Sequence, residues 1–169
     1  LFLNIPTRGL IGARTQVLTL TRGEGVLTSL MAGYCPRTAD IETRHNGVLV
    51  SSDTGSATAY SLRNLEDRGV FFVEAGTPIY EGMVVGENNK DKDIALNVVR
   101  AKKMTNMRSA NKEIDEKIRA PRRMDLEQFL EYLDTDELLE VTPKSMRLRK
   151  RHLNEKKRLR LTKVDPLAS

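Results

Sequence analysis

The stretch MDLEQFLEYL at residues 124–133 carries the clearest secondary-structure signal in the chain, and it predicts an amphipathic helix. Asp125 can cap this helix, and Gln128 stands three residues further on, as a capping box requires. Met124 and Phe129 occupy the two positions of a hydrophobic staple. The face that we expect to pack against a sheet consists of Leu126, Phe129, Leu130 and Leu133.

Short β-prone segments lie on both sides of this helix. A turn is expected at Asn46-Gly47, and Asp53-Thr54-Gly55 predicts a β-hairpin between residues 48–51 and 56–62. One or two helical turns are expected over residues 62–68. Further short strands are expected over residues 70–73, 79–85, 94–99, 138–141 and 146–150. These elements predict an α+β fold with a β-rich, barrel-like unit and a few short helices.

The beginning of the chain gives weaker signals. Residues 1–5 and 25–34 are typical of strands, and Thr7 is a candidate helix N-cap. Residues 9–22 combine a helical apolar face with a β-prone composition, which leaves both structures open. The chain opens in an apolar run with neither an initiator Met nor a signal-peptide pattern, so we interpret its start as the cut end of a longer chain.

Composition narrows the class of protein. Of the 169 residues, 39% are hydrophobic and 30% are charged, which suits a soluble globular protein. No run approaches the roughly 18 apolar residues of a membrane helix, so we expect no membrane partner. A single cysteine, Cys35, cannot form an internal disulfide, which indicates a reducing compartment. With four Phe, four Tyr and no Trp, the chain is poorly equipped to stack on exposed bases.

Charge is distributed unevenly along the chain. Residues 1–99 carry nine Lys and Arg against eleven Asp and Glu, a net of −2, whereas residues 100–169 carry nineteen against twelve, a net of +7. A basic half joined to a nearly neutral half indicates a polyanionic partner on one face. The alternative interpretation is a solubilising surface.

The residues that most enzymes use are scarce. Two histidines, His45 and His152, and one cysteine give no metal-ligand spacing, and the GxSxG and HExxH motifs are absent. The phosphate-binding motif GxxxxGK[ST] is also absent, and NKDK at residues 89–92 has Lys where the guanine-reading motif NKxD needs Asp. We therefore expect no catalytic residue, no metal and no cofactor in this chain.

The first basic cluster follows a predicted strand and spans residues 100–123. A polar, basic loop of this length is more often functional than structural, because it is too polar to bury. Lys and Arg can bind phosphates there, and Asn and Thr can hydrogen-bond to sugars or base edges. The candidate RNA-binding residues are Lys102, Lys103, Thr105, Asn106, Arg108 and Ser109. The alternative is a solvated loop without a partner.

The second basic cluster spans residues 144–163 and holds ten basic residues against the single acid Glu155. In a strand over residues 146–150, alternate side chains point the same way at intervals of about 6.6 Å, so the arginines form a row with Met146 and Leu148 buried behind it. Such a row can grip the phosphates of a structured RNA. The candidates are Lys144, Arg147, Arg149, Lys150, Arg151 and His152. Asn154 can cap a final basic helix, and the alternative is a basic tail without a fixed partner.

Eight short sequence motifs resemble those of a single protein family. They are PTRGLIGAR (6–14), TRGEG (21–25), RHNGVLV (44–50), EDRG (66–69), YEGMVVG (80–86), KKMTNMRS (102–109), DELLEVTP (136–143) and RLRKRHL (147–153). In colinear order over essentially the whole chain, they resemble the signatures of the TypA/BipA family of translational GTPases, which is related to elongation factor G. Residues 32–40 match poorly, with Ala39 where the family usually has Gly, and residues 154–169 lie in a stretch that varies widely within the family.

The resemblance implies a division of the chain. Residues 1–36 look like the second half of a ferredoxin-like fifth domain, with residues 9–22 mostly helical, and residues 37–45 look like a linker. Residues 46–153 look like the family-specific C-terminal ribosome-binding domain, followed by a basic helix or tail over residues 154–169. The first half of the ferredoxin-like sheet would be missing, and its open edge suggests a homodimer as one alternative.

The resemblance also implies a function. In the family, this domain docks at the ribosomal A site, and the loop that matches residues 102–109 reaches toward the tRNA acceptor end and the large-subunit rRNA. The parent protein hydrolyses GTP on the ribosome, with GTP and Mg²⁺ held in a domain outside this chain, and it is linked to stress adaptation and large-subunit assembly. A bacterial cytoplasm is the expected location, with a plastid as the alternative.

Two other functions stay open at this point. One is a protein-interaction module that contacts ribosomal proteins rather than RNA, through the hairpin expected around Asp53-Thr54-Gly55. The other is a standalone nucleotide hydrolase, which the missing GxxxxGK[ST] motif disfavours.

Overall fold

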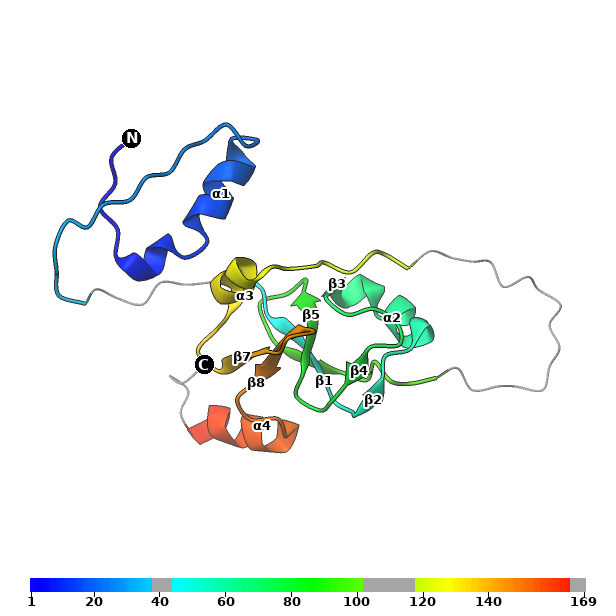
Figure 1. The fold of residues 1–169 in the computed structure, drawn as a ribbon. Helices are drawn as coiled ribbons and strands as arrows, with labels where there is room; N and C mark the ends of the chain where they lie inside the picture. Colours follow the sequence, from blue (N-terminus) through cyan, green and yellow to red (C-terminus); the bar gives the residue numbers. More distant parts are fainter. Residues whose placement is uncertain (38–43, 102–117, 165–169) are drawn as a thin grey trace, which may run out of the picture.

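The computed structural model describes residues 1–37, 44–101 and 118–164 and confirms an α+β fold (Figure 1). The helices are η1 (Thr7–Leu10), α1 (Ala13–Leu20), α2 (Ala59–Asn64), η2 (Glu66–Arg68), α3 (Leu126–Tyr132) and α4 (Glu155–Val164), of which η1 and η2 are 3-10 helices. The strands are β1 (Val48–Ser51), β2 (Gly55–Ser56), β3 (Gly69–Phe71), β4 (Pro78–Ile79), β5 (Val84–Asn88), β6 (Ile94–Leu96), β7 (Glu137–Val141) and β8 (Met146–Lys150).

The strands form one mixed sheet and two small antiparallel pairs. The mixed sheet has the order β3-β5-β1-β6, in which β1 runs antiparallel to β5 and parallel to β6. The pairs are β2–β4 and β7–β8, and a single antiparallel bridge between Met83 and Arg149 joins β8 to the chain just before β5. None of these sheets closes on itself within the described residues. The expectation of a barrel-like unit is therefore wrong, because the strands are too short to pair continuously around a barrel.

Both faces of the mixed sheet are buried, which explains why β1 is apolar almost throughout. Leu49 points into a core with α2, β4 and β6, whereas Val48 and Val50 point into a second core. The second core contains Phe129 of α3 and Leu148 of β8. Figure 1 shows α2 on one side of the sheet, with α3 and the β7–β8 pair on the other. The sheet is thus the middle layer, and α3 and the β7–β8 pair cover one of its faces.

The expected β-hairpin around Asp53-Thr54-Gly55 does not form. Strand β1 pairs with β5 and β6, and β2 pairs with β4. Most of residues 56–62 belongs to α2, because the Thr58 side chain accepts a hydrogen bond from the backbone N–H of Ser61 at 3.2 Å and caps the helix. The helical turns expected over residues 62–68 correspond to the end of α2 and to η2, and Gly69 begins β3.

Helix α3 confirms the capping box but only part of the predicted apolar face. The Asp125 carboxylate accepts from the backbone N–H of Gln128 at 2.8 Å, and the Gln128 side chain accepts from the N–H of Asp125 at 3.1 Å. Phe129 is buried and Leu133 is half-buried, but Leu126 and Leu130 are exposed. Tyr132, which the prediction left out, takes their place in the core. The helix therefore faces the sheet through a different stripe from the one predicted.

The beginning of the chain corrects three further predictions. Helix α1 confirms the helical expectation for residues 9–22, but residues 1–5 and 25–34 form no strand. A strand needs a hydrogen-bonded neighbour, and within the described residues neither segment has one. Thr7 does not cap a helix with its side chain, since Pro6 is the N-cap of η1 and Gly12 is that of α1. Most of the linker expected over residues 37–45 lies outside the described residues.

Candidate nucleic-acid interface

The β7–β8 pair carries the second basic cluster. Its register places Glu137 opposite Lys150, Leu139 opposite Leu148 and Glu140 opposite Arg147. Because side chains alternate along a strand, Glu137, Leu148 and Lys150 share the buried face, whereas Arg147 and Arg149 share the other. Leu148 is 1% exposed and Lys150 is 2% exposed. The predicted strand and its alternation are confirmed.

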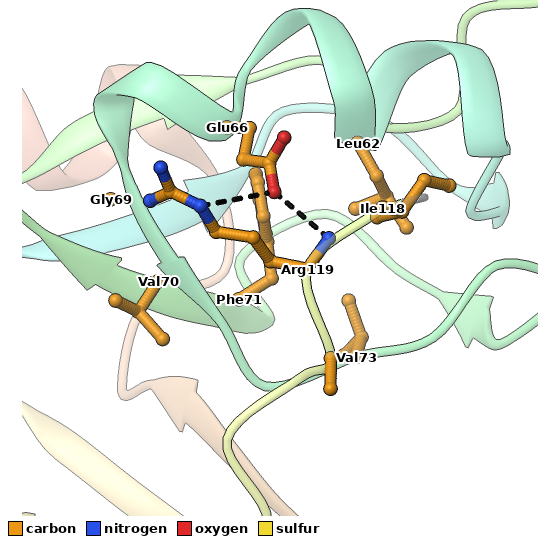
Figure 2. Close-up of a pocket in the computed structure, with 9 residues that line it drawn as sticks. Leu62, Glu66, Gly69, Val70, Phe71, Val73, Ile118 and Arg119 are labelled. Atoms are coloured by element: carbon orange, nitrogen blue, oxygen red, sulfur yellow. Dashed lines mark hydrogen bonds and ion pairs between the residues drawn. The ribbon is translucent and has the colours of Figure 1, made fainter. Parts of the chain in front are cut away.

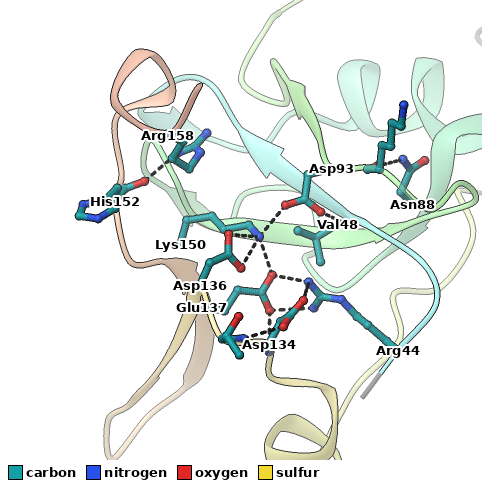
Figure 3. A network of polar contacts seen from close by, with 12 residues as sticks. Arg44, Val48, Asn88, Asp93, Asp134, Asp136, Glu137, Lys150, His152 and Arg158 are labelled. Atoms are coloured by element: carbon teal, nitrogen blue, oxygen red, sulfur yellow. Dashed lines mark hydrogen bonds and ion pairs between the residues drawn. The ribbon is translucent and has the colours of Figure 1, made fainter. Parts of the chain in front are cut away.

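Lys150 is placed very differently from a phosphate-binding lysine. Its ammonium lies 2.8 Å from a carboxylate oxygen of Asp136, 3.0 Å from Glu137 and 2.5 Å from Asp93 (Figure 3). Burial opposes the ammonium charge, but these carboxylates outweigh it and raise the pKa of Lys150 above its ordinary value. Lys150 is therefore a buried, fully paired cation, and its predicted contact with RNA is not compatible with this position.

Arg44 completes the buried charge network. Its guanidinium donates to both carboxylate oxygens of Glu137, at 2.7 and 2.6 Å, and to the carbonyl of Tyr132 at 3.2 Å. The same guanidinium lies 4.8 Å from the centre of the Tyr132 ring. Asp93 also accepts from the backbone N–H of Val48 at 2.8 Å. The network thus connects the chain before β1, the start of β6 and both strands of the β7–β8 pair (Figure 3).

The remaining candidates of this cluster lie on the outer side of the β7–β8 pair or beyond its end. Arg149 lies 2.7 Å from Glu140 through its Nε, and Arg151 donates to the carbonyl of Thr135 at 3.1 Å. Lys144 and Arg151 are exposed, whereas Arg147, Arg149 and His152 are half-buried. The structure therefore brings the three arginines to one region, but it presents them unequally to solvent.

Helix α4 extends this basic region. The Asn154 side chain accepts from the backbone N–H of Lys157 at 3.2 Å, which confirms the predicted cap. Lys156, Lys157 and Arg160 are exposed and fall within a sector of about 100° around the helix axis. The cap gives this predicted basic helix a fixed start. We name Lys144, Arg147, Arg149, Arg151, Lys156, Lys157 and Arg160 the β8–α4 basic surface.

Gly82 allows the junction between β8 and α4 to lie against the chain that precedes β5. Its φ of 84° lies in the left-handed region, and a Cβ atom there would lie 2.5 Å from the Cα of Leu153. The carbonyl of Gly82 accepts from the backbone N–H of Lys150 at 2.9 Å. Only glycine allows the junction between β8 and α4 to approach this closely.

The two ends of the first basic cluster are held by α2 and η2. The carbonyl of Arg100 accepts hydrogen bonds from the hydroxyls of Thr58 and Ser61, each at 2.7 Å. At the other end, the Glu66 carboxylate accepts from the backbone N–H of Arg119 at 2.9 Å (Figure 2). The chain thus leaves the domain next to α2, after Arg100, and returns to it next to η2, at Arg119. Lys102, Lys103, Thr105, Asn106, Arg108 and Ser109 lie between these points, outside the described residues.

Sequence reasoning missed the residues that hold these surfaces in place. Thr58, Ser61 and Glu66 gave no signal, because their partners lie about 40 or more positions away in the chain. For Lys150 a signal existed, since the alternation that buries Met146 and Leu148 places Lys150 on the same face. The matching partners are the acids Glu137, the first residue of β7, and Asp136 just before it.

The described residues offer little room for a small-molecule ligand at the ends of the first basic cluster. A hollow of about 70 Å³ beside Arg119 is lined by Leu62, Phe71, Val73 and Ile118, and it is too small for a nucleotide (Figure 2). No group of three or more His, Cys, Asp or Glu in the part of the chain that the structure describes is arranged to hold a metal ion. None of the described helices is long and apolar enough to cross a membrane.

The fold is a small α+β domain with exposed basic residues beside β8 and along α4. The sequence profile of the TypA/BipA C-terminal domain matches residues 46–155, and the chain belongs to this family. It is 49% identical over 164 residues to the large ribosomal subunit assembly factor BipA of Bacillus subtilis, covering 96% of this chain and 27% of that protein.

Two further relatives carry the same name. The Synechocystis protein is 49% identical over 146 residues, covering 86% of this chain and 24% of the relative. The protein of Escherichia coli K12 is 44% identical over 161 residues, covering 95% and 26%. The chain therefore spans about a quarter of the length of the relatives it matches.

Proposed function

We propose that this chain is the ribosome-binding C-terminal module of a TypA/BipA translational GTPase and acts in large-subunit assembly and in translation under stress. The observation that carries the proposal is the β8–α4 basic surface, which a buried charge network and a capped helix hold in place. Phosphate contacts dominate the affinity of proteins for RNA, so a fixed set of cations suits a ribosomal partner. The relatives' name, a large ribosomal subunit assembly factor, agrees with that partner.

The two basic clusters are assigned different tasks in this proposal. The β8–α4 basic surface anchors the module on large-subunit rRNA. The segment with Lys102, Lys103, Thr105, Asn106, Arg108 and Ser109 approaches the A site and the acceptor end of its tRNA. Arg100 before this segment and Arg119 after it are hydrogen-bonded to α2 and η2, and these contacts fix the two points between which the segment runs. A structured RNA is recognised in this way through its shape and backbone.

Catalysis is not assigned to this chain. GTP hydrolysis belongs to the parent protein, whose GTP and Mg²⁺ are held by residues outside these 169, and the sequence here lacks the GxxxxGK[ST] motif. A calorimetric titration of the chain with GTP is expected to show no binding. Binding in the micromolar range would favour the nucleotide-hydrolase alternative. The proposed location is the bacterial cytoplasm, with a plastid as the alternative.

The proposal is tested by co-sedimentation of the chain with large ribosomal subunits across a salt series. Binding is expected at low salt and should weaken steeply as salt rises, because each phosphate contact releases counterions. Two double charge reversals, Lys102→Glu with Lys103→Glu and Lys156→Glu with Lys157→Glu, should each weaken binding. The matched control is Arg68→Glu with Lys90→Glu, two exposed residues beside the β3–β5 pairing, which makes the same charge change.

Each outcome of this experiment decides between functions. Loss of binding in the two test variants but not in the control supports both RNA contacts. Binding that hardly depends on salt favours the alternative, a module that contacts ribosomal proteins. Absence of binding at every salt concentration contradicts ribosome docking by this chain. A homodimer through residues 1–36 is tested separately, by sedimentation equilibrium.

A further inference from the structure

A carboxylate lies in the middle of the outer face of the β7–β8 pair, among the arginines. Glu140 accepts a hydrogen bond from the hydroxyl of Tyr80 at 2.7 Å, and its other oxygen lies 2.7 Å from Nε of Arg149. Arg147 is directly opposite Glu140 in the strand register. The Glu140 carboxylate lowers the net positive charge of this surface, so charge accumulation alone does not explain why a glutamate lies here.

The contacts of Arg149 leave one part of its guanidinium available. Nε lies 2.7 Å from Glu140, an ion-pair distance without hydrogen-bond geometry, and Nη1 donates to the carbonyl of Lys150 at 3.3 Å. The side chain is 26% exposed, and Nη2 has no contact among the described residues. These two contacts restrict the rotamers of Arg149 before any ligand arrives.

Arg147 is the second cation at this position. Among the described residues it has no hydrogen-bond or ion-pair partner, and it is half-buried. Both guanidiniums lie close enough to Tyr80 to act on its ionisation. Burial and the hydrogen bond to Glu140 raise the pKa of Tyr80, and the charges of Arg149 and Arg147 oppose that rise. The Tyr80 hydroxyl therefore stays protonated at neutral pH and remains a donor to Glu140.

We propose that Arg147 and Arg149 form a fork that grips one phosphodiester of an RNA backbone, and that Glu140 and Tyr80 are positioning residues that hold the fork open. This inference rests on the proposed function and specifies which atoms of the β8–α4 basic surface bind. Tyr80 donates to the Glu140 carboxylate, and the ion pair between that carboxylate and Arg149 restricts the Arg149 guanidinium. A restricted guanidinium on the same face of the strand as Arg147 suits a phosphate, because the phosphate oxygens accept several hydrogen bonds at once.

An RNA phosphate fits this fork better than a protein carboxylate does. The chain on both sides of the fork carries the exposed cations Lys144, Arg151, Lys156 and Lys157, which suit a continuous polyanion. An isolated carboxylate from a protein would use the fork alone and would leave these neighbouring cations without a partner.

The test measures binding of the 169-residue chain to a fluorescein-labelled RNA hairpin by anisotropy, at several salt concentrations. Tyr80→Phe keeps every charge but removes the donor to Glu140, and we expect binding about twofold to tenfold weaker, as for the loss of one hydrogen bond. Arg147→Ala with Arg149→Ala should weaken binding more and reduce the salt slope by about two. Circular dichroism checks that each variant is folded.

Glu140→Gln separates positioning from simple charge. Removing a negative charge should tighten RNA binding if only net charge matters, but it should weaken binding if the carboxylate orients Arg149. The matched control is Asp91→Asn, an exposed carboxylate on the loop between β5 and β6, where the same charge change should leave binding unchanged or slightly tighter. The two substitutions are therefore expected to act in opposite directions.

The outcomes are distinguishable from those of the ribosome experiment. Tighter binding of Glu140→Gln together with unchanged binding of Tyr80→Phe overturns the positioning role. Unchanged hairpin binding of the double arginine variant, or no hairpin binding by the wild-type chain at low salt, overturns the fork itself. If the hairpin results agree with expectation while ribosome co-sedimentation fails, the fork stands and only the ribosomal assignment is lost.

Discussion

The ammonium of Lys150 lies 3.0 Å from the carboxylate of Glu137, and the two side chains are 2% and 0% exposed. They face each other across the β7–β8 pair, on the side that packs against the mixed sheet. Two opposite charges so deeply buried must be paired, because water cannot solvate them there. The pair therefore fixes how the basic strand lies on the rest of the domain.

The first prediction concerns this pair. Lys150→Met leaves the buried Glu137 and the half-buried Asp136 without their shared cation, and we expect a loss of about 3 kcal/mol in the free energy of unfolding. Lys157→Met, an exposed lysine in α4, is the matched control and should change stability by no more than about 0.5 kcal/mol. Urea denaturation measures both. Equal stability of the two variants would contradict the structural role of Lys150.

The second prediction is a loss of stability at alkaline pH. The carboxylates around Lys150 raise its pKa, so its contribution is complete below the unfolded value near 10.4 and declines as pH rises above it. Burial raises the pKa of Tyr132 as well, and ionisation of that phenol acts in the same direction above about pH 10. The free energy of unfolding, measured between about pH 8 and pH 11, should therefore fall toward the upper end.

Tyr132→Phe provides a third prediction. The Tyr132 hydroxyl is buried and finds no hydrogen-bond partner among the residues that the structure describes. Its removal should be neutral or should stabilise the domain by up to about 1 kcal/mol at neutral pH, because an unpaired buried hydroxyl is costly. The same variant should also show a shallower alkaline decline. Destabilisation by more than about 1 kcal/mol would indicate a hydrogen bond that this structure does not contain.

The fourth prediction tests the cap of α3. Asp125→Ala removes the acceptor for the backbone N–H of Gln128 and should cost about 1 kcal/mol. Glu127→Ala, at an exposed position of the same first turn, should cost less because only the helix-dipole interaction is lost. Thermal or urea unfolding of the two variants gives the comparison. A larger cost for Glu127→Ala would argue against the capping box as the main determinant of the helix start.

The fifth prediction concerns the anchor of the first basic cluster. Glu66→Ala removes the acceptor for the N–H of Arg119, whereas Glu66→Gln keeps an oxygen at that position and loses only the ion pair with the guanidinium, which is 3.4 Å away. If this anchor sets where the first basic cluster returns to the domain, the Ala variant should bind ribosomes several-fold more weakly than the Gln variant, with both folded. Co-sedimentation at one low salt concentration is sufficient for the measurement.

Local signals predicted α3, β7, β8 and the start of α4 from the sequence alone. For α3 and α4 the signal was a capping residue, for β8 it was a strict alternation, and for β7 it was a short apolar run before Pro143. The hairpin at Asp53-Thr54-Gly55 failed because a turn signal says nothing about which strand becomes the partner. Strand β1 found its neighbours in β5 and β6, more than 30 positions away.

The charge of a residue did not predict whether its side chain is exposed. Lys150 belongs to the most basic stretch of the sequence, yet it is among the most buried side chains described. The periodicity of β8 already placed it inward, and three acids supply the partners that its burial requires. Basic residues in an amphipathic strand should therefore be assigned by their face first and by their charge second.

Arg44 and Lys150 both bind Glu137, and this has a mechanical consequence. Arg44, just before β1, and Lys150, at the end of β8, form ion pairs with the same carboxylate. These two ion pairs therefore hold the two segments at a short distance from each other. A displacement of residue 44 would therefore be felt at β8, the strand that carries Arg147 and Arg149, through the shared carboxylate of Glu137.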